Sequence, residues 1–247
     1  MQERPNAPAE AGTRAVNAER MLEGHLELER LLRSRRSVRA FRADPVSRSQ
    51  VLEILDLAAT APSNSNTQPW RLHVLAGAAK RALSAALGPA HEADDFPPPA
   101  HFPEVLPERL RCNQEEFGQL YYSTLGIDRG DRAARARQTG KNYDFFGAPV
   151  GLIFTLDDRL TRHSWLDCGL FVQNVMLAAR SHGLATCPQV SFVRYQTLIA
   201  RHLGFEEGEV VACGMSMGYA DPDAPVNAMR VPRAPVNCFA RLAGFED

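Results

Sequence analysis

Apolar residues recur at helical spacing in several parts of the chain. The pattern predicts helices over residues 26–35, 47–61, 78–87 and 195–203. Ser47 and Gln50 have the spacing of a capping box, in which the serine side chain caps the first turn of the second helix. Pro62 follows the apolar face of that helix and predicts where it stops.

Other stretches are apolar on all sides. "APVGLIFTL" at 148–156 and "EVVACGMSMGYA" at 209–220 have the length and composition of strands buried on both faces. Residues 71–76 alternate between polar and apolar side chains and predict a further strand. Residues 165–180 predict a helix buried in the core or against a second subunit, with Gly183 as its C-terminal cap.

These elements mix strands and helices without strict alternation, which favours the α+β class. We expect one domain over residues 25–247, preceded by a flexible leader over residues 1–24 that is rich in Ala, Glu and Arg. A proline-rich stretch opens at Gly88, and charged helical patterns continue to Gly140, so we expect an inserted lid segment there. Its aromatic residues either cover a ligand or belong to the core; they are Phe96, Phe102, Phe117, Tyr121 and Tyr122.

Charge and composition restrict the class of partner. The formal net charge is −1, so no global attraction to nucleic acid or to an anionic membrane exists, and no apolar run has the length of a transmembrane helix. Five widely spaced cysteines fit neither a disulfide framework nor a zinc site, and the histidines do not pair at metal-ligand spacing. We therefore expect a cytoplasmic protein with free thiols and no metal.

Two basic clusters are candidates for binding an anion. "RRSVRAF" places Arg35, Arg36 and Arg39 around Ser37, and arginine matches phosphate oxygens in a bidentate fashion. "MRVPRAP" adds a second small cluster close to the C-terminus. Taken alone, each cluster is either a phosphate site or a solvated basic patch.

A third stretch, "APSNSNTQPW" at 61–70, carries far more hydrogen-bonding side chains than a turn needs. It is either solvated loop or part of a ligand site. The chain has no dinucleotide fingerprint, no P-loop, no metalloprotease motif and no nucleophile elbow. Asp157 and Asp158 are adjacent carboxylates that we expect to meet water. Because the sequence offers no general acid or nucleophile, an enzyme of this kind would take its reactivity from a bound cofactor.

Several blocks occur in an order that resembles the FMN-dependent nitroreductase family: "RRSVRAF", "APSNSNTQPW", "FGAPVGLIF", "WLDCGLFVQNVMLAARSHGLATCPQ", "CGMSMGYADPDAPVN" and "RVPRAP". The match covers about residues 28–239. The resemblance implies an α/β/α sandwich with a central, mostly antiparallel sheet. It also implies a homodimer with FMN at the interface, each flavin held by both subunits.

The resemblance also implies a set of flavin-binding residues, with no catalytic side chain beyond the flavin. They are Arg35, Arg36, Ser37, Arg39, Pro62, Ser63, Asn64, Asn66, Pro188, Gln189, Val190, Arg230 and Arg233. The first three and the two C-terminal arginines would address the phosphate, and Arg39 the pyrimidine edge of the ring. The residues at 62–66 would reach the flavin of the other subunit, and those at 188–190 would lie against the ring, with backbone N–H facing N5.

Two positions depart from the family pattern. Val231 stands where some relatives have a lysine, so charge compensation at the phosphate must depend on Arg35, Arg36 and Arg230. Val190 stands where some relatives have a glutamate near flavin N5, which removes any side-chain acid there.

The resemblance implies an enzyme that transfers two electrons from NADH or NADPH to a nitroaromatic or quinone-like acceptor by a ping-pong mechanism. Two alternatives stay open. One is other chemistry of the same flavin fold, such as dehalogenation, flavin cleavage or substrate dehydrogenation. The other is a flavin-binding protein without turnover.

Overall fold

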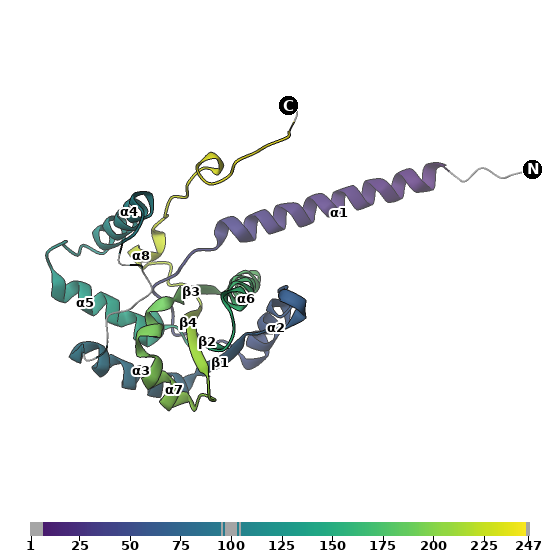
Figure 1. The fold of residues 1–247 in the computed structure, drawn as a ribbon. Helices are drawn as coiled ribbons and strands as arrows, with labels where there is room; N and C mark the ends of the chain where they lie inside the picture. The colour runs from purple at the N-terminus through teal and green to yellow at the C-terminus, as the bar shows by residue number, and fades with distance from the viewer. Residues whose placement is uncertain (1–6, 95, 97–102, 104, 246–247) are drawn as a thin grey trace, which may run out of the picture.

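A three-layer arrangement of helices around one sheet forms the body of the computed structural model, which describes residues 7–94, 96, 103 and 105–245 (Figure 1). The α-helices are α1 (Ala7–Ser34), α2 (Arg48–Ala58), α3 (Gly77–Ala93), α4 (Glu108–Thr124), α5 (Arg132–Gly140), α6 (Arg162–Ser181), α7 (Gln196–Leu203) and α8 (Pro225–Ala228). The strands are β1 (Arg71–Ala76), β2 (Val150–Asp157), β3 (Ala185–Gln189) and β4 (Glu209–Gly218). Short 3₁₀ turns are η1 (Asn64–Asn66), η2 (Lys141–Gly147), η3 (Val190–Tyr195) and η4 (Val236–Cys238).

The sheet has four strands in the order β1-β2-β4-β3, and every pair is antiparallel. The central strands β2 and β4 are the two apolar runs of the sequence, and all of β2 up to Leu156 is buried. The predicted α+β class and antiparallel sheet are confirmed. β3 lies at the edge of the sheet, so only one of its two sides is paired with another strand of the sheet.

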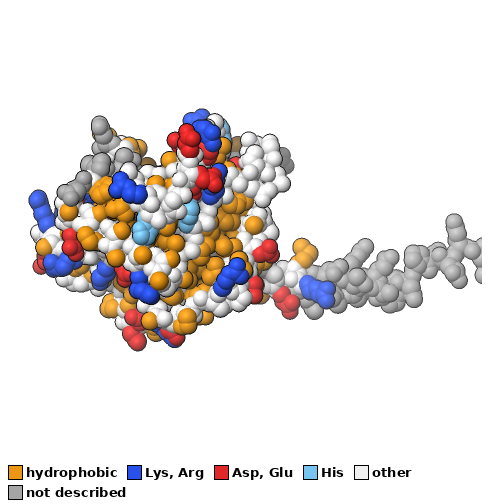
Figure 2. All heavy atoms as spheres, turned by 90° about the horizontal axis from the view of Figure 1, so that it is seen from below, with side chains coloured by type: hydrophobic (Ala, Val, Ile, Leu, Met, Phe, Trp, Pro, Cys, Tyr) orange, Lys and Arg blue, Asp and Glu red, His pale blue; other side chains and the backbone are white. Residues whose placement is uncertain are grey.

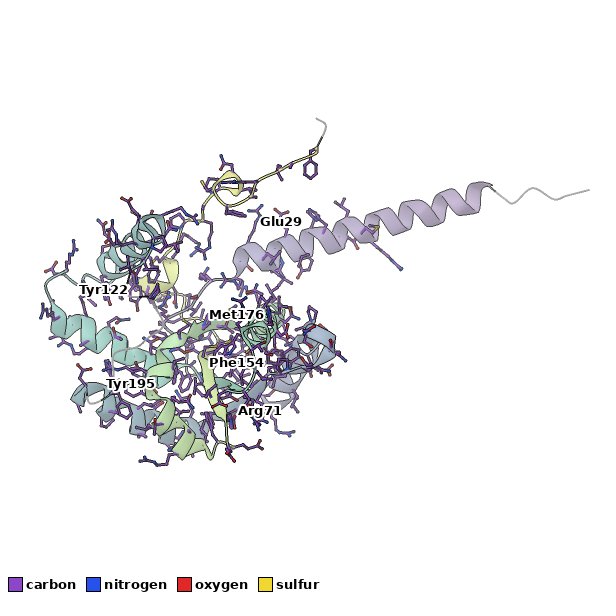
Figure 3. All side chains as sticks on the ribbon, in the orientation of Figure 1. Glu29, Arg71, Tyr122, Phe154, Met176 and Tyr195 are labelled. Carbon is purple, nitrogen blue, oxygen red and sulfur yellow. The ribbon has the colours of Figure 1, made fainter. Side chains whose placement is uncertain are left out.

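Each face of the sheet carries its own core. Phe154 points to the side of α2 and α6, where it packs with Met176, and Ile153 points to the side of α3, α7 and η2, where Tyr195 lies. Figure 3 shows Met176 and Tyr195 on opposite sides of the strands. Burying each large apolar side chain contributes about 1.5–3 kcal/mol. Because neighbouring side chains of β2 point to opposite faces, the same strand packs against both helical layers.

The predicted capping box is only half formed. The Ser47 hydroxyl accepts a hydrogen bond from the Gln50 backbone N–H at 3.1 Å, as expected of an N-cap. The Gln50 side chain does not return to Ser47; it donates to the His182 carbonyl oxygen at 3.3 Å instead. This contact joins the start of α2 to the end of α6.

The N-terminal region differs from the prediction. α1 begins at Ala7, whereas the sequence favoured a flexible leader over residues 1–24 and a helix only from residue 26. Ala, Glu and Arg are strong helix formers, and this propensity continues the helix backwards. α1 projects away from the body, and the described part of the helix stands out in both views (Figures 1 and 2). Among the helices of the described chain, none combines the length and the apolar character that a membrane span requires.

The segment predicted as an insertion begins later than expected. α3 continues through Pro89 to Ala93, and α4 and α5 then supply helices before η2. Phe96 packs edge-on against Tyr195 at 4.9 Å between ring centroids, so it belongs to the core. Phe102 lies outside the described residues, and the lid role of the segment stays a prediction.

A glycine fixes where the chain leaves β3. Phe192 in η3 packs against Gly214 of β4, where an added Cβ would sit 2.4 Å from a ring carbon. Only a glycine leaves this space, because real Cβ atoms do not approach that closely. The ring thereby fixes the turn that directly follows Gln189.

A buried carboxylate organises the end of the sheet remote from β3. Glu209 is 7% exposed, and its carboxylate accepts a hydrogen bond from the Thr155 hydroxyl at 2.5 Å and lies 2.7 Å from His73 Nε2. The Glu206 N–H donates to the other oxygen at 3.1 Å. Burial acts to raise the pKa of Glu209, but these hydrogen bonds outweigh it, so the pKa lies below its ordinary value of 4.5.

We predict that Glu209→Gln lowers the free energy of unfolding at pH 7 by about 1.5–3 kcal/mol, because it weakens hydrogen bonds to a charged acceptor. A carboxylate with a lowered pKa contributes stability above its unfolded-state pKa and loses it as the pH falls through the folded-state value. The gap between wild type and variant should therefore narrow below about pH 4.5. Urea unfolding at several pH values measures this difference in the free energy of unfolding. A difference that does not change with pH would contradict the lowered pKa of Glu209.

Candidate functional site

A cavity of about 660 Å³ opens between the end of α1, the segment after it, α4 and the chain beyond α8. Most of its lining is basic or apolar. The residues that line it are Leu32, Arg33, Ser34, Arg35, Arg36, Ser37, Arg39, Phe117, Met229, Arg230, Val231 and Arg233. It thus joins "RRSVRAF" to "MRVPRAP", two clusters almost 200 residues apart in the sequence.

Backbone hydrogen bonds hold the first cluster against the sheet. Ser37 forms a parallel bridge with Thr186 of β3, and the Val38 N–H donates to the Thr186 carbonyl at 3.0 Å. Four residues further on, the Arg42 N–H donates to the Tyr219 carbonyl at 2.9 Å. The segment that carries the arginines is therefore fixed beside β3 at one end and beyond β4 at the other.

Asn227 of α8 completes this frame, although no pattern in the sequence singles it out. It is 3% exposed, and its Oδ1 accepts from the Arg39 backbone N–H at 2.9 Å. Its Nδ2 donates to the carbonyls of Ala40 and Asp221, each at 2.8 Å. One amide thus ties the first cluster to the chain that leads into the second.

The cavity gathers positive charge without a compensating carboxylate: none of the described residues that line it is acidic. Burial, and then the neighbouring Arg233, lowers the pKa of Arg35. Burial, and then Arg230 and Arg180, lowers the pKa of Arg36. The Nε atom of Arg36 is buried and has no hydrogen-bond partner among the described residues. These are the features of a site that an anion completes, and a phosphate monoester fits the donor set.

Arg180 of α6 is another residue that the sequence did not single out. Its Nε donates to the Ser34 hydroxyl at 3.0 Å, at the last residue of α1. This pair, together with Arg36 and Thr186, lines a small cavity of about 30 Å³. Arg180 stands behind the anion site, where it fixes the end of α1 and adds positive charge.

Aromatic rings from α4 cover Arg39. Its guanidinium carbon lies 5.3 Å from the ring centroid of Phe117 and 5.1 Å from that of Tyr121, within cation–π range. The two rings stack on each other, and the Tyr121 hydroxyl accepts from Gln138 Nε2 at 2.8 Å. Both residues belong to the predicted insertion, which therefore contributes directly to the cavity.

The polar loop after α2 lies outside this cavity, and much of its polarity is used internally. The Ser63 hydroxyl accepts from the Gln68 N–H at 3.0 Å, and the Gln68 amide donates to Asn66 Oδ1 at 3.1 Å. Pro62, Ser63, Asn64 and Asn66 therefore do not meet the arginines within one chain. Pro62, Asn64 and Asn66 are exposed on the surface, and Ser63 is partly exposed.

The end of β3 is also outside the lining of the cavity. The Gln189 side chain is 3% exposed, donates to the Asn142 carbonyl at 2.8 Å and accepts from the Ser216 hydroxyl at 2.7 Å. Its amide is thus committed to the core, and only its backbone can face a ligand. Val190 is exposed, and Pro188 is partly exposed.

Six of the predicted residues therefore meet at the cavity: Arg35, Arg36, Ser37, Arg39, Arg230 and Arg233. The fold and this cavity define a protein with an arginine-lined site beside the edge strand of an antiparallel sheet. The chain belongs to the nitroreductase family, whose model matches residues 32–219.

Relatives with assigned activities resemble it over nearly their whole length. It is 52% identical over 220 residues to a 4-nitrobenzoate reductase of Pseudomonas putida, covering 89% of this chain and 97% of the relative. It is 39% identical to a nitrobenzene nitroreductase of Ectopseudomonas oleovorans, covering 86% and 95%. The resemblance read from the sequence is confirmed.

A comparison with solved structures leads to the same family. The FMN-dependent nitroreductase NfnB of Mycobacterium smegmatis, crystallised in complex with NADPH, superposes with a TM-score of 0.85 at 34% identity. The match covers 89% of this chain and 99% of that one. The three-layer architecture is therefore the fold of this family.

We predict that inorganic phosphate stabilises the protein without any cofactor. At ten times its dissociation constant it should add about 1.4 kcal/mol to the free energy of unfolding. Arg36→Gln should remove most of this gain, because Arg36 contributes the buried, unpartnered Nε. Thermal unfolding with increasing phosphate at constant ionic strength measures it.

The matched control is Arg81→Gln, which removes an exposed arginine of α3 outside the cavity. The control should keep the phosphate gain of the wild type. Equal loss in both variants would mean that phosphate acts through general charge rather than through the cavity.

Proposed function

We propose that this protein is an FMN-dependent oxidoreductase that carries two electrons from NADH or NADPH to a nitroaromatic acceptor. The observation that carries the proposal is the arginine-lined cavity with the buried, unpartnered Nε of Arg36. The family match and the FMN-dependent structure of NfnB support FMN as the phosphorylated ligand. When bound, FMN would supply the redox chemistry that links oxidation of NAD(P)H to two-electron reduction of the acceptor.

Within the chain, the cavity residues divide into two roles. Arg35, Arg36 and Ser37, with the two C-terminal arginines, would hold the phosphate through charge-assisted hydrogen bonds. Arg39 would face the pyrimidine edge of the ring, where a fixed cation stabilises negative charge as it develops. Phe117 and Tyr121 keep its guanidinium at the cavity wall.

The remaining predicted residues would complete the site from two other directions. The backbone at Pro188, Gln189 and Val190 would lie against the ring from the end of β3, with no side-chain acid among them. The loop residues Pro62, Ser63, Asn64 and Asn66 would reach the flavin of a second copy, because they do not meet the cavity of their own chain.

A homodimer is the second part of the proposal. Leu166 and Leu170 on α6 are 65% and 39% exposed, and Leu22 and Leu26 on α1 are also exposed. A helix as long as α1, projecting from the body, gains little stability without a surface to pack on. A second copy of this chain would cover these apolar faces.

Relatives point to the class of acceptor. Two relatives are named 4-nitrobenzoate reductases, at 52% and 38% identity. We therefore propose a nitroarene acceptor, with 4-nitrobenzoate the first compound to test. All five cysteines are unpaired, which supports our placement of the protein in the reducing cytoplasm.

We predict that the purified protein is yellow with FMN and loses its colour under anaerobic NADH or NADPH. Addition of 4-nitrobenzoate should restore the oxidised spectrum, and cycles should repeat in steady state with parallel double-reciprocal plots. Absorbance at the flavin maximum and product analysis measure both steps. A single reduction without turnover would indicate a flavin-binding protein, and preference for a halogenated phenol would indicate dehalogenation.

We predict that Leu166→Asp combined with Leu170→Asp gives a folded monomer that has lost FMN, although every cavity residue is intact. Charges on the exposed face of α6 would repel a second copy of the chain. Each flavin site would then lose the residues that the second copy supplies. Light scattering, circular dichroism and flavin content measure this. Leu160→Asp, on the turn between β2 and α6, is the control that should stay dimeric and yellow.

Two results would contradict this assignment. A monomer that binds FMN with wild-type affinity would mean that one chain contains the whole site. A double variant that stays dimeric would mean that α6 is not in the interface.

A further inference from the structure

Three side chains on one face of α6 hold the polar loop at its two ends and near its middle. Asn174 Nδ2 donates to the Ala58 carbonyl at 3.3 Å, where α2 ends. The Phe171 ring stacks on Trp70, with centroids 4.8 Å apart and planes 7° apart. One turn earlier, Asp167 Oδ2 accepts from the Asn64 backbone N–H at 3.2 Å. The spacing of i, i+4 and i+7 puts the three contacts in line along the helix.

The loop between these contacts is strained. Ser65, Asn66 and Gln68 have φ angles of 51°, 56° and 47°, in the left-handed region. Each such residue costs about 1 kcal/mol or more when it is not glycine. This conformation persists only if its surroundings hold it, and Asn64, which Asp167 holds, directly precedes the strained residues.

Burying the Asp167 carboxylate to hold a loop has a high free-energy cost. Asp167 is 6% exposed, and a buried carboxylate loses hydration that one hydrogen bond does not replace. Phe171 and Asn174 already secure the two ends. The carboxylate therefore adds a fixed position for Asn64, at the point where the loop's polar groups are most exposed.

We propose that Asp167 is a positioning residue of the flavin site, which fixes the backbone at Asn64 so that the loop meets the flavin of the neighbouring subunit in one conformation. The inference rests on the proposed function. Asp167 does not touch the cofactor in this scheme; it acts through the loop. A loop that is already ordered loses less conformational entropy on binding, so the flavin binds more tightly.

The test compares Asp167→Ala, Asp167→Asn and the control Glu209→Gln, each as the full-length protein. Alanine removes the acceptor, whereas asparagine keeps an oxygen for the Asn64 N–H. Glu209→Gln alters a buried carboxylate at the far end of the sheet and reports what general destabilisation does. The readouts are the FMN dissociation constant from flavin fluorescence, the oligomeric state and amide hydrogen exchange of the loop.

We expect Asp167→Ala to weaken FMN binding about tenfold, the equivalent of one hydrogen bond to a charged group. Asp167→Asn should recover most of the affinity. Exchange over residues 62–68 should rise in the alanine variant and stay unchanged in Glu209→Gln, even where that variant melts earlier. If the alanine variant does not fold, the test is made with Asp167→Asn, by comparing its FMN dissociation constant and its hydrogen exchange over residues 62–68 with those of the wild type.

Wild-type FMN affinity in a folded Asp167→Ala dimer would overturn the proposal. Equal weakening of FMN binding by Asp167→Ala and Glu209→Gln would also overturn it, because general destabilisation would then explain the effect. Failure of the proposed function gives a different result, because the wild-type protein itself would then not bind FMN.

Discussion

Positive charge gathered in one partly buried cavity is the constraint on which the rest of this structure depends. Burial, and then the nearby Arg233 and Arg230, disfavour the charge of Arg35 and Arg36, and no described acidic residue lines the cavity. The frame that holds them is neutral: backbone bonds to Thr186 and the amide of one asparagine. Neutral donors and acceptors position the cations without quenching them, so the site keeps its attraction for an anion.

The sheet gives this frame its rigidity. β2 is buried on both faces, as is β4 from Gly214 onward, and the helical layers on each side pack against alternate side chains of these strands. The arginine segment is hydrogen-bonded beside β3, and α6, which packs on the same sheet, carries Arg180 at one end and Asp167 toward the other. The anion cavity and the polar loop are thus positioned by one helix and one sheet.

The sequence predicted those parts of the structure that depend on local pattern. The strands β2 and β4 and the N-cap Ser47 followed from periodicity and cap chemistry. The family resemblance, rather than local pattern, selected the six residues that meet at the cavity. Asn227 and Arg180 did not, because each works through a partner far away in sequence, and nothing local distinguishes them. The helix before residue 26 was missed because a composition rich in Ala, Glu and Arg fits both a solvated chain and a strong helix.

The polar loop shows why composition alone does not reveal a binding surface. Ser63 and Asn66 were expected to face a ligand, yet both accept hydrogen bonds within the loop and stabilise its left-handed residues. A side chain that shapes the loop can still present its remaining donor or lone pair outward, because hydroxyls and amides each make more than one hydrogen bond. The surplus of polar groups in "APSNSNTQPW" therefore serves conformation first, and an ordered loop is what makes recognition by the exposed groups specific.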